Sequence, residues 1–145
     1  MLERITTISR AAPGLRREDV FGIIRGAHPL NQLAGISGAL IYLDGWFLQL
    51  LEGAPEALAA TRARIARDPR HEASVVRSRE RGGLCRLFAG QALALRTRAC
   101  LDAGLLADFG YRPGFPVRDF PADVLVEFLV QACHRTPARP DRLVS

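Results

Sequence analysis

Hydrophobic and polar residues follow two periods along the first hundred positions of the chain. Short stretches alternate with a period of two or form apolar runs between turns, which predicts strands. Longer stretches carry apolar residues at spacings of three and four, which predicts amphipathic helices. The predicted strands are 4–9, 35–43, 46–52, 74–79 and 91–96, and the predicted helices are 16–27 and 55–67. The order β-α-β-β-α-β-β predicts a ferredoxin-like α+β sandwich with both helices on one sheet face.

Turn-forming residues set the boundaries of these elements. Asp44-Gly45, between two apolar runs, is a strong signal for a two-residue hairpin. Pro55 suits the first turn of a helix, where its missing N–H costs nothing. Pro29 lacks the N–H that a helix interior needs, so we expect the first helix to end near residue 27.

The pattern changes beyond residue 99. Three segments and a tail follow: a weakly helical stretch 101–108, a turn-rich stretch 110–121, an apolar helix 123–133, and a terminal tail 136–145 expected to fray. We expect the helices to cover the sheet face that the first two helices leave free. The chain then divides into a domain of residues 1–98 and a C-terminal helical cap and tail, 99–145.

Composition narrows the protein class. The chain has 145 residues, 48% hydrophobic and 24% charged, which indicates one globular domain with a substantial core. No apolar stretch reaches the roughly 18 residues of a membrane span, and the first residues do not form an apolar signal core. The sequence therefore predicts a cytoplasmic protein that does not enter a membrane.

Every basic residue is an arginine, and the net charge is +5. Segment 62–86 alone carries eight arginines and three acidic residues. These arginines are spread over a predicted helix and strand, with no interleaved aromatic residues that would stack on bases. We interpret them as a solvated face, and a nucleic-acid partner is not expected. The three cysteines and three histidines show no zinc spacing, so neither a metal site nor a disulfide framework is expected.

Gln49 is the residue that a purely structural interpretation explains least well. It shares its strand face with Phe47 and Leu51, so the alternation points its amide into the core. A buried amide without a partner costs about 1–3 kcal/mol. Its partner is backbone, a neighbour such as Asn31 or Thr7, or a ligand, and a satisfied core glutamine remains one alternative.

Three other polar residues have local explanations when taken alone. Asn31 follows the first predicted helix, where asparagine commonly serves a turn. Asp68 and Arg70 follow the second predicted helix and suit a C-terminal turn with a local ion pair.

Several stretches nevertheless occur together in a fixed order. They are SRAAPGL at 9–15, Asn31, GISGAL at 35–40, WFLQLLEG at 46–53, IARDPRH at 65–71 and FAG at 88–90. Together they resemble the BLUF family, sensors of blue light using FAD, over about residues 2 to 95. The predicted strand and helix order is also similar to the BLUF order, in which the flavin lies between the two helices over the sheet.

The resemblance implies roles for the polar residues. Gln49 matches the family glutamine that hydrogen-bonds the isoalloxazine ring and rearranges on illumination. Asn31 matches the asparagine that binds the pyrimidine edge of the flavin, where an amide can donate and accept at once. Asp68, Arg70 and His71 match residues at that edge or in the neighbouring loop.

The resemblance also places apolar residues near the ring, namely Ile23 or Ile24 on the first helix and Leu51 on the third strand. It implies FAD as the cofactor, with FMN or no flavin as the other options.

The sequence departs from the family at its photochemical positions. Thr7 stands where BLUF domains carry the tyrosine that reduces the excited flavin, and threonine is not a one-electron donor. Gln91 and Leu93 stand at the family's tryptophan and methionine positions. Tyr42 lies on a neighbouring strand and Trp46 has the opposite strand parity, so neither is a substitute. The usual photocycle is therefore expected to be altered or lost.

Three hypotheses follow. The first is a flavin-binding sensor-like regulatory protein with an altered or lost photocycle. The second is a flavin-free interaction module derived from the same fold. The third, an acylphosphatase-type enzyme, needs a phosphate-binding loop that opens a helix, whereas residues 35–38 lie in a predicted strand, so we expect no enzyme.

In either of the first two hypotheses the output would pass to a regulatory protein partner or through self-association. The apolar helix 123–133 is the candidate surface, and plain coverage of the sheet is the alternative.

Overall fold

The computed structural model describes residues 1–111 and 120–134. Its elements are β1 Glu3–Ala11, α1 Arg17–Leu33, β2 Ser37–Leu43, β3 Trp46–Gly53, α2 Pro55–Ala66, β4 His71–Arg81, β5 Ala94–Thr97, a 3-10 helix Arg98–Cys100, α3 Ala103–Asp108 and α4 Ala122–His134. The predicted order of strands and helices is confirmed. The predicted tail and most of the turn-rich stretch 110–121 lie outside the described residues.

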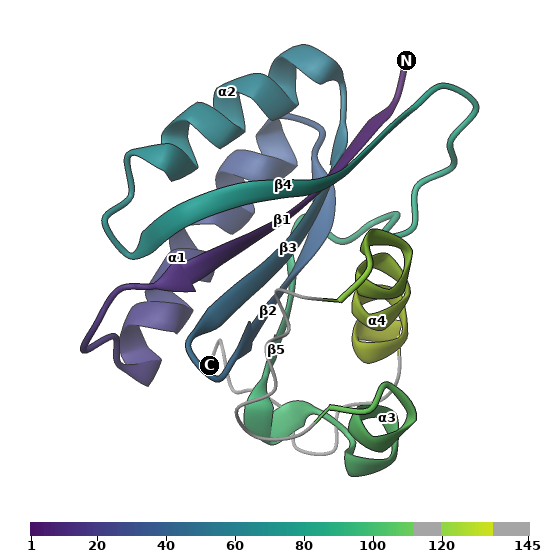
Figure 1. The fold of residues 1–145 in the computed structure, drawn as a ribbon. Coiled ribbons are helices and arrows are strands. Elements are labelled where there is room, and N and C mark those ends of the chain that lie inside the picture. The colour runs from purple at the N-terminus through teal and green to yellow at the C-terminus, as the bar shows by residue number, and fades with distance from the viewer. Residues whose placement is uncertain (112–119, 135–145) are drawn as a thin grey trace.

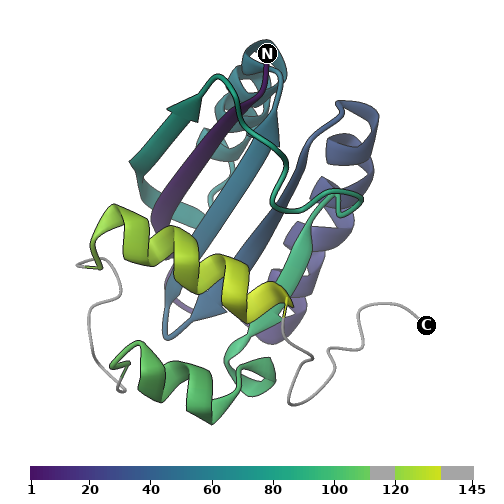
Figure 2. The ribbon, with the colours of Figure 1, turned by 90° about the vertical axis from the view of Figure 1, so that its right-hand side faces the viewer.

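The five strands form one mixed sheet in the order β4-β1-β3-β2-β5. β5 runs parallel to β2, whereas the other neighbouring strands are antiparallel. Helices α1 and α2 cover one face, and α4 crosses the other face (Figure 1, Figure 2). The expected ferredoxin-like α+β sandwich with a C-terminal helical extension is therefore confirmed. None of the helices among the described residues is long and apolar enough to cross a membrane.

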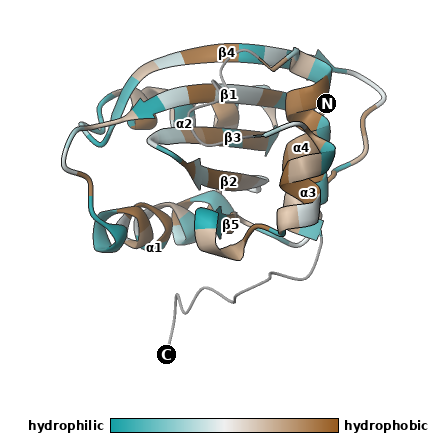
Figure 3. Ribbon diagram, turned by 60° about the horizontal axis from the view of Figure 1, so that its bottom comes forward, coloured by the Kyte–Doolittle hydropathy of each residue, from teal (hydrophilic) through white to brown (hydrophobic). Residues whose placement is uncertain are grey.

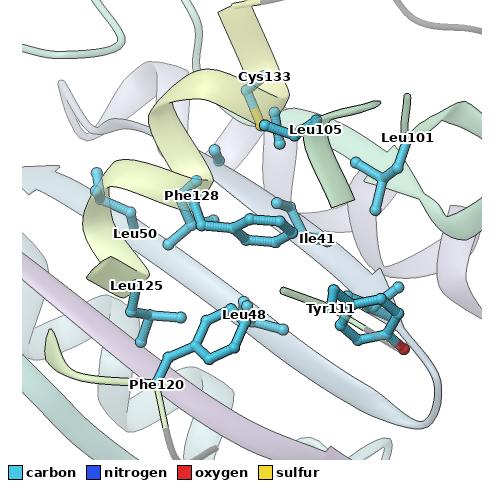
Figure 4. Packing of buried hydrophobic residues seen from close by; sticks show 14 of the residues in the cluster. Ile41, Leu48, Leu50, Leu101, Leu105, Tyr111, Phe120, Leu125, Phe128 and Cys133 are labelled. Carbon is cyan, nitrogen blue, oxygen red and sulfur yellow. The ribbon is translucent and has the colours of Figure 1, made fainter. Parts of the chain in front are cut away.

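Alternate strand positions fill two apolar layers, one on each face of the sheet. The layer beneath α1 and α2 includes Ile5, Ile24, Leu40, Phe47, Leu51, Leu58 and Leu95. The layer beneath α4 includes Ile8, Ile41, Leu48, Leu50, Phe88, Leu125 and Phe128 (Figure 4). Figure 3 shows apolar residues along α4 and along the strands beneath it. The apolar face of α4 thus covers the sheet, the second of the two roles considered for this helix.

The hairpin between β2 and β3 forms as predicted. Asp44 and Gly45 both have positive φ, 48° and 84°, and Leu43 pairs with Trp46 across the turn. Two consecutive left-handed residues match the right-handed twist of the flanking strands, which explains why Asp-Gly is favoured here.

The expectation that Pro29 ends the first helix is wrong, because α1 continues to Leu33. Proline removes one helical hydrogen bond, but tertiary contacts hold the turn that follows it. The Asn31 side chain donates to the Ala92 carbonyl at 3.0 Å, and the Asn31 carbonyl accepts from Ile36 N–H at 2.9 Å. Asn31 is consequently a helical residue directed inward rather than a turn residue.

The last two strands differ in extent from the prediction. β4 is longer than 74–79, and β5 begins at Ala94 instead of residue 91. The Gln91 carbonyl accepts a hydrogen bond from Gly38 N–H at 3.0 Å, and the Ala92 carbonyl accepts one from the Asn31 side chain. These residues are therefore hydrogen-bonded, but not as part of the regular pairing between β2 and β5. β4 also breaks register with β1 twice, and Ala73, at a positive φ of 49°, lies in the second break.

A buried carboxylate connects three parts of the sheet. The Glu52 side chain is 0% exposed and accepts from Ser37 Oγ at 3.0 Å and from Arg4 Nε at 3.3 Å. It also accepts from the backbone N–H groups of Leu87 at 3.0 Å and Phe88 at 2.7 Å. Glu52 therefore fastens the connection between β4 and β5 to the centre of the sheet.

Replacing Glu52 by glutamine should lower the free energy of unfolding by about 3 kcal/mol, because the buried Arg4 and two backbone donors lose their charged acceptor. Chemical denaturation measures this change. Glu72→Gln, on the exposed part of β4, is the matched control and should change stability by less than about 0.5 kcal/mol. Equal stability of the two variants would contradict the central role of Glu52.

Candidate ligand-binding site

A cavity of about 240 Å³ opens between α1 and α2 above β3. Six of the residues singled out in the sequence line it, namely Ile23, Asn31, Gln49, Asp68, Arg70 and His71. They come from α1, β3 and the turn that joins α2 to β4, so the fold gathers residues that are up to 48 positions apart.

Gln49 lies on the floor of this cavity, on the face that the strand alternation predicts. Its side chain is 7% exposed, yet its amide has no hydrogen-bond partner within residues 1–111 and 120–134. Neither Asn31 nor Thr7 hydrogen-bonds it. Its amide atoms are not among the buried atoms that lack a partner, so they are open to the cavity and can bond a ligand that enters it.

Asn31, in contrast, already has partners on both amide atoms. Its Nδ2 donates to the Ala92 carbonyl at 3.0 Å, and its Oδ1 accepts from Arg64 Nη2 at 3.4 Å. An arginine can only donate and a carbonyl can only accept, so the two contacts fix the orientation of the amide.

Asp68 and Arg70 form the local ion pair that was considered for them. Arg70 Nε donates to Asp68 Oδ1 at 2.8 Å and Nη2 donates to Oδ2 at 2.6 Å, while the Arg70 backbone N–H donates to Oδ1 at 3.0 Å. These bonds lower the pKa of the Asp68 carboxyl and raise the pKa of Arg70. The pair shapes the turn after α2 and also forms part of the cavity wall.

His71 closes the same end of the cavity. Its Nδ1 is 3.0 Å from Ser9 Oγ, and its ring packs against Phe47 with centroids 4.5 Å apart. Burial lowers the pKa of His71; Asp68 opposes this shift, whereas Arg70 adds to it. The ring is therefore held in its neutral form at neutral pH.

Thr7 and Leu51 border a different space. A second cavity of about 120 Å³ lies between α2 and strands β1, β3 and β4. Its lining residues are Ile5, Thr7, Gln49, Leu51, Arg62, Ile65, Ala66 and Ser74. Thr7 and Gln49 are direct cross-strand neighbours, and Gln49 borders both cavities. Ile24, the remaining predicted residue, belongs to the apolar layer and lines neither cavity.

Sequence reasoning missed the residues that α2 contributes. Thr61, Arg64 and Ile65 all line the main cavity, and their spacing of three and four positions places them on one side of the helix. The same helical periodicity that identified α2 could have indicated this face. Arg67 completes the set of missed polar residues.

The family comparison decides the interpretation of this site. The sequence model of the family described as "Sensors of blue-light using FAD", BLUF, matches residues 2–94. The chain belongs to the BLUF family. The match contains β1 through the first residue of β5, and therefore every element that lines the two cavities.

Photoactivated adenylate cyclases are similar to this BLUF chain in sequence. Subunit beta from Euglena longa is 39% identical over 70 residues, which is 48% of this chain and 8% of that protein. Subunit alpha from Euglena gracilis is 38% identical over 68 residues, 47% of this chain and 7% of that protein. The similarity thus spans less than a tenth of the length of either cyclase subunit.

Solved BLUF structures share the fold. The structure titled "BlsA photo-activated state" aligns with a TM-score of 0.82 at 22% identity, covering 97% of this chain and 100% of that one. The dark-state structure of the BLUF protein BlrB aligns with a TM-score of 0.72 at 24% identity, covering 90% and 93%. A bacterial light-regulated adenylyl cyclase aligns with a TM-score of 0.71 at 27% identity, covering 74% and 32%.

His71 should make stability depend on pH. Because its pKa in the folded state lies below the ordinary value of 6.5, the unfolded chain binds more protons between the two values. The free energy of unfolding should therefore fall as the pH drops below about 6.5. The lowered pKa of Asp68 adds a separate loss only below its ordinary value of 3.8.

Denaturation between pH 7 and pH 5 measures this slope. His71→Phe should flatten it, whereas His28→Phe, at an exposed position of α1, should leave it unchanged. A pKa for His71 at or above 6.5, measured by NMR titration, would contradict the assignment.

Proposed function

We propose that this BLUF protein binds a flavin between α1 and α2 and acts as a sensor-like regulatory protein with an altered or lost photocycle. The observation that carries the proposal is Gln49, a residue only 7% exposed whose side-chain amide has no hydrogen-bond partner among the described residues and lines the cavity. A bound flavin would supply the absorption of blue light and the redox chemistry that side chains lack.

The cavity fits the ring system of a flavin better than a whole dinucleotide. Ile23, Ala27 and Ile65 provide apolar walls, and polar groups gather at the Asn31 and Asp68 end. Its volume of about 240 Å³ lies just below the range of small-molecule clefts, roughly 300–1,000 Å³. The ring would therefore lie inside, and the ribityl chain and phosphates would lie outside.

Each residue has a proposed part in holding the ring. Gln49 would bond the isoalloxazine, and Asn31 its pyrimidine edge, which requires the Asn31 amide to exchange Arg64 for the ligand. Arg70 and His71 would border that edge.

Three residues have supporting parts in this assignment. Asp68 would hold Arg70 in place, Leu51 would pack beneath the ring, and Ile24 would support Ile23 from the apolar layer.

Two arginines at the cavity favour a phosphorylated flavin. Arg64 and Arg67 both line it, and neither has an acidic partner within 4 Å among the described residues. They would attract the phosphate groups of FAD, and FMN would meet the same charges. FAD is the cofactor that we propose, with FMN as the second option.

The altered photocycle follows from what surrounds Gln49. Among residues 1–111 and 120–134, no tyrosine or tryptophan lines either cavity. Tyr42 packs against Phe47 with centroids 5.1 Å apart, and Trp46 packs against the layer on the opposite face. Thr7 offers only a short hydroxyl beside Gln49, which cannot donate an electron.

A flavin-free interaction module is the second candidate function. Its supporting observation is that both amide atoms of Asn31 already have protein partners. In either function we propose a protein that is not an enzyme and that signals through a regulatory partner or self-association. We also retain the division into residues 1–98 and 99–145 as a proposal. The apolar face of α4 is buried against the sheet, so a partner would need another surface.

Absorption spectra of the protein after incubation with FAD, in the dark and under blue light, test the proposal. A bound flavin band that stays static and fluorescent, or that shifts abnormally, supports it. A normal reversible shift would overturn the altered photocycle, and no bound flavin would favour the interaction module.

Replacing Gln49 by leucine should weaken flavin binding about tenfold or shift its absorption band, because one hydrogen bond to the ring is lost. Fluorescence titration with FAD measures the affinity. Gln32→Leu, at an exposed position near the end of α1, is the control and should bind as the unaltered protein does. Unchanged affinity and spectrum in Gln49→Leu would place the ring elsewhere.

Replacing Thr7 by tyrosine should restore a light-induced shift of the flavin band, because a phenol would then lie beside Gln49. Difference spectroscopy on the flavin-loaded variant measures the shift. Thr7→Phe fills the same space without a hydroxyl and should show no light-induced shift of the flavin band. If Thr7→Tyr binds flavin but shows no shift, the other departures from the family also disable the photocycle.

A further inference from the structure

The second cavity shares only Gln49, Leu51 and Ile65 with the proposed flavin contacts. It measures about 120 Å³ and lies between α2 and strands β1, β3 and β4. A single water molecule occupies about 30 Å³ of liquid, and apolar cavities of about 150 Å³ take up benzene. The space is therefore of the size of one small ring rather than of one water.

Short side chains and irregular strand pairing create this space. Thr7 on β1 lies opposite Gln49 on β3 and Val76 on β4, and the β1–β4 register shifts on both sides of Thr7. Ala73 takes a left-handed conformation within the second of these shifts, and Ser74, directly after it, lines the cavity. Bulges of this kind redirect side chains and are typical of functional edges.

The lining combines an apolar floor with polar groups that have no protein partner. Ile5 and Leu51, 3% and 4% exposed, line the cavity from the sheet, and Ile65 lines it from α2. The Gln49 side chain, in a residue only 7% exposed, has no hydrogen bond with the described residues, and neither has the hydroxyl of Thr7. These groups can donate and accept hydrogen bonds at the edge of an otherwise apolar space.

We propose that this cavity is a binding site for a small aromatic alcohol of the phenol class. The ring would lie on Ile5, Leu51 and Ile65, and its hydroxyl would bond the Gln49 amide. Arg62 also lines the cavity. Its guanidinium group would attract the face of an aromatic ring and would repel a positively charged amine. The site goes beyond the proposed flavin function, because it does not require a flavin in the neighbouring cavity.

Titration of the flavin-free, 145-residue chain with phenol tests the site. The probe has seven non-hydrogen atoms, so a dissociation constant of about 1 mM is expected. The readouts are an increase in melting temperature with phenol concentration and a shift of the Gln49 side-chain amide resonances in ¹H–¹⁵N spectra. Toluene, which lacks the hydroxyl, should bind at least threefold more weakly.

Two substitutions of Thr7 distinguish the effect of the cavity volume from the effect of the Thr7 hydroxyl. Thr7→Phe fills the cavity and should weaken phenol binding at least tenfold. Thr7→Val keeps the volume, removes only the hydroxyl and should stay within threefold of the unaltered protein. If Thr7→Phe does not fold, Ser74→Leu narrows the same cavity from β4 and should also weaken binding.

Three results would overturn the assignment: phenol binding that Thr7→Phe and Ser74→Leu both leave unchanged, Gln49 resonances that do not move, or toluene binding as tightly as phenol. The outcome is independent of the proposed function. A protein that binds phenol but not FAD would retain this site and lose the flavin proposal, and the reverse result would do the opposite.

Discussion

The buried carboxylate of Glu52 is the contact on which the rest of the site depends. Its bonds to the backbone of Leu87 and Phe88 anchor the connection that leads from β4 to β5. That connection brings the Ala92 carbonyl beneath α1, where it holds Asn31, and brings the Gln91 carbonyl to the start of β2. One wall of the ligand cavity is thus held in place by a charge on the opposite face of the sheet. Such a charge is tolerated in the core only because all its neighbours are donors.

The alternation of side chains along β3 explains how one strand carries both the buried Glu52 and the residues that line the ligand cavity. Leu48, Leu50 and Glu52 point towards α4, whereas Phe47, Gln49 and Leu51 point towards α1 and α2. The first set is fully satisfied by apolar contacts and by hydrogen bonds. The second contains a polar amide on an otherwise apolar strand face, with no hydrogen-bond partner among the described residues. Local inconsistencies of this kind concentrate at functional sites, and the BLUF family match, over residues 2–94, includes this strand.

The parts of the fold that follow from local rules could be predicted from the sequence. The Asp44-Gly45 hairpin depends on two left-handed residues, and the direction of Gln49 depends only on strand parity. The end of α1 could not be predicted from the sequence. The helix continues past Pro29 because Asn31 donates a hydrogen bond to the carbonyl of Ala92, 61 positions later. The second cavity could not be predicted either. It depends on register shifts between β1 and β4 that no periodicity reveals.

Gln49 lines both cavities with one side chain. A primary amide has a donating and an accepting end, and a half-turn about its terminal torsion exchanges them. Asn31 has lost this freedom, since Arg64 and the Ala92 carbonyl fix its orientation. Gln49 retains it, because no described residue holds either end. An occupant of one cavity that fixes the Gln49 orientation therefore determines whether a donor or an acceptor faces the other, and coupling of this kind is reciprocal. Communication between ligands in the two proposed sites would accordingly need only this one side chain on β3, without movement of the backbone.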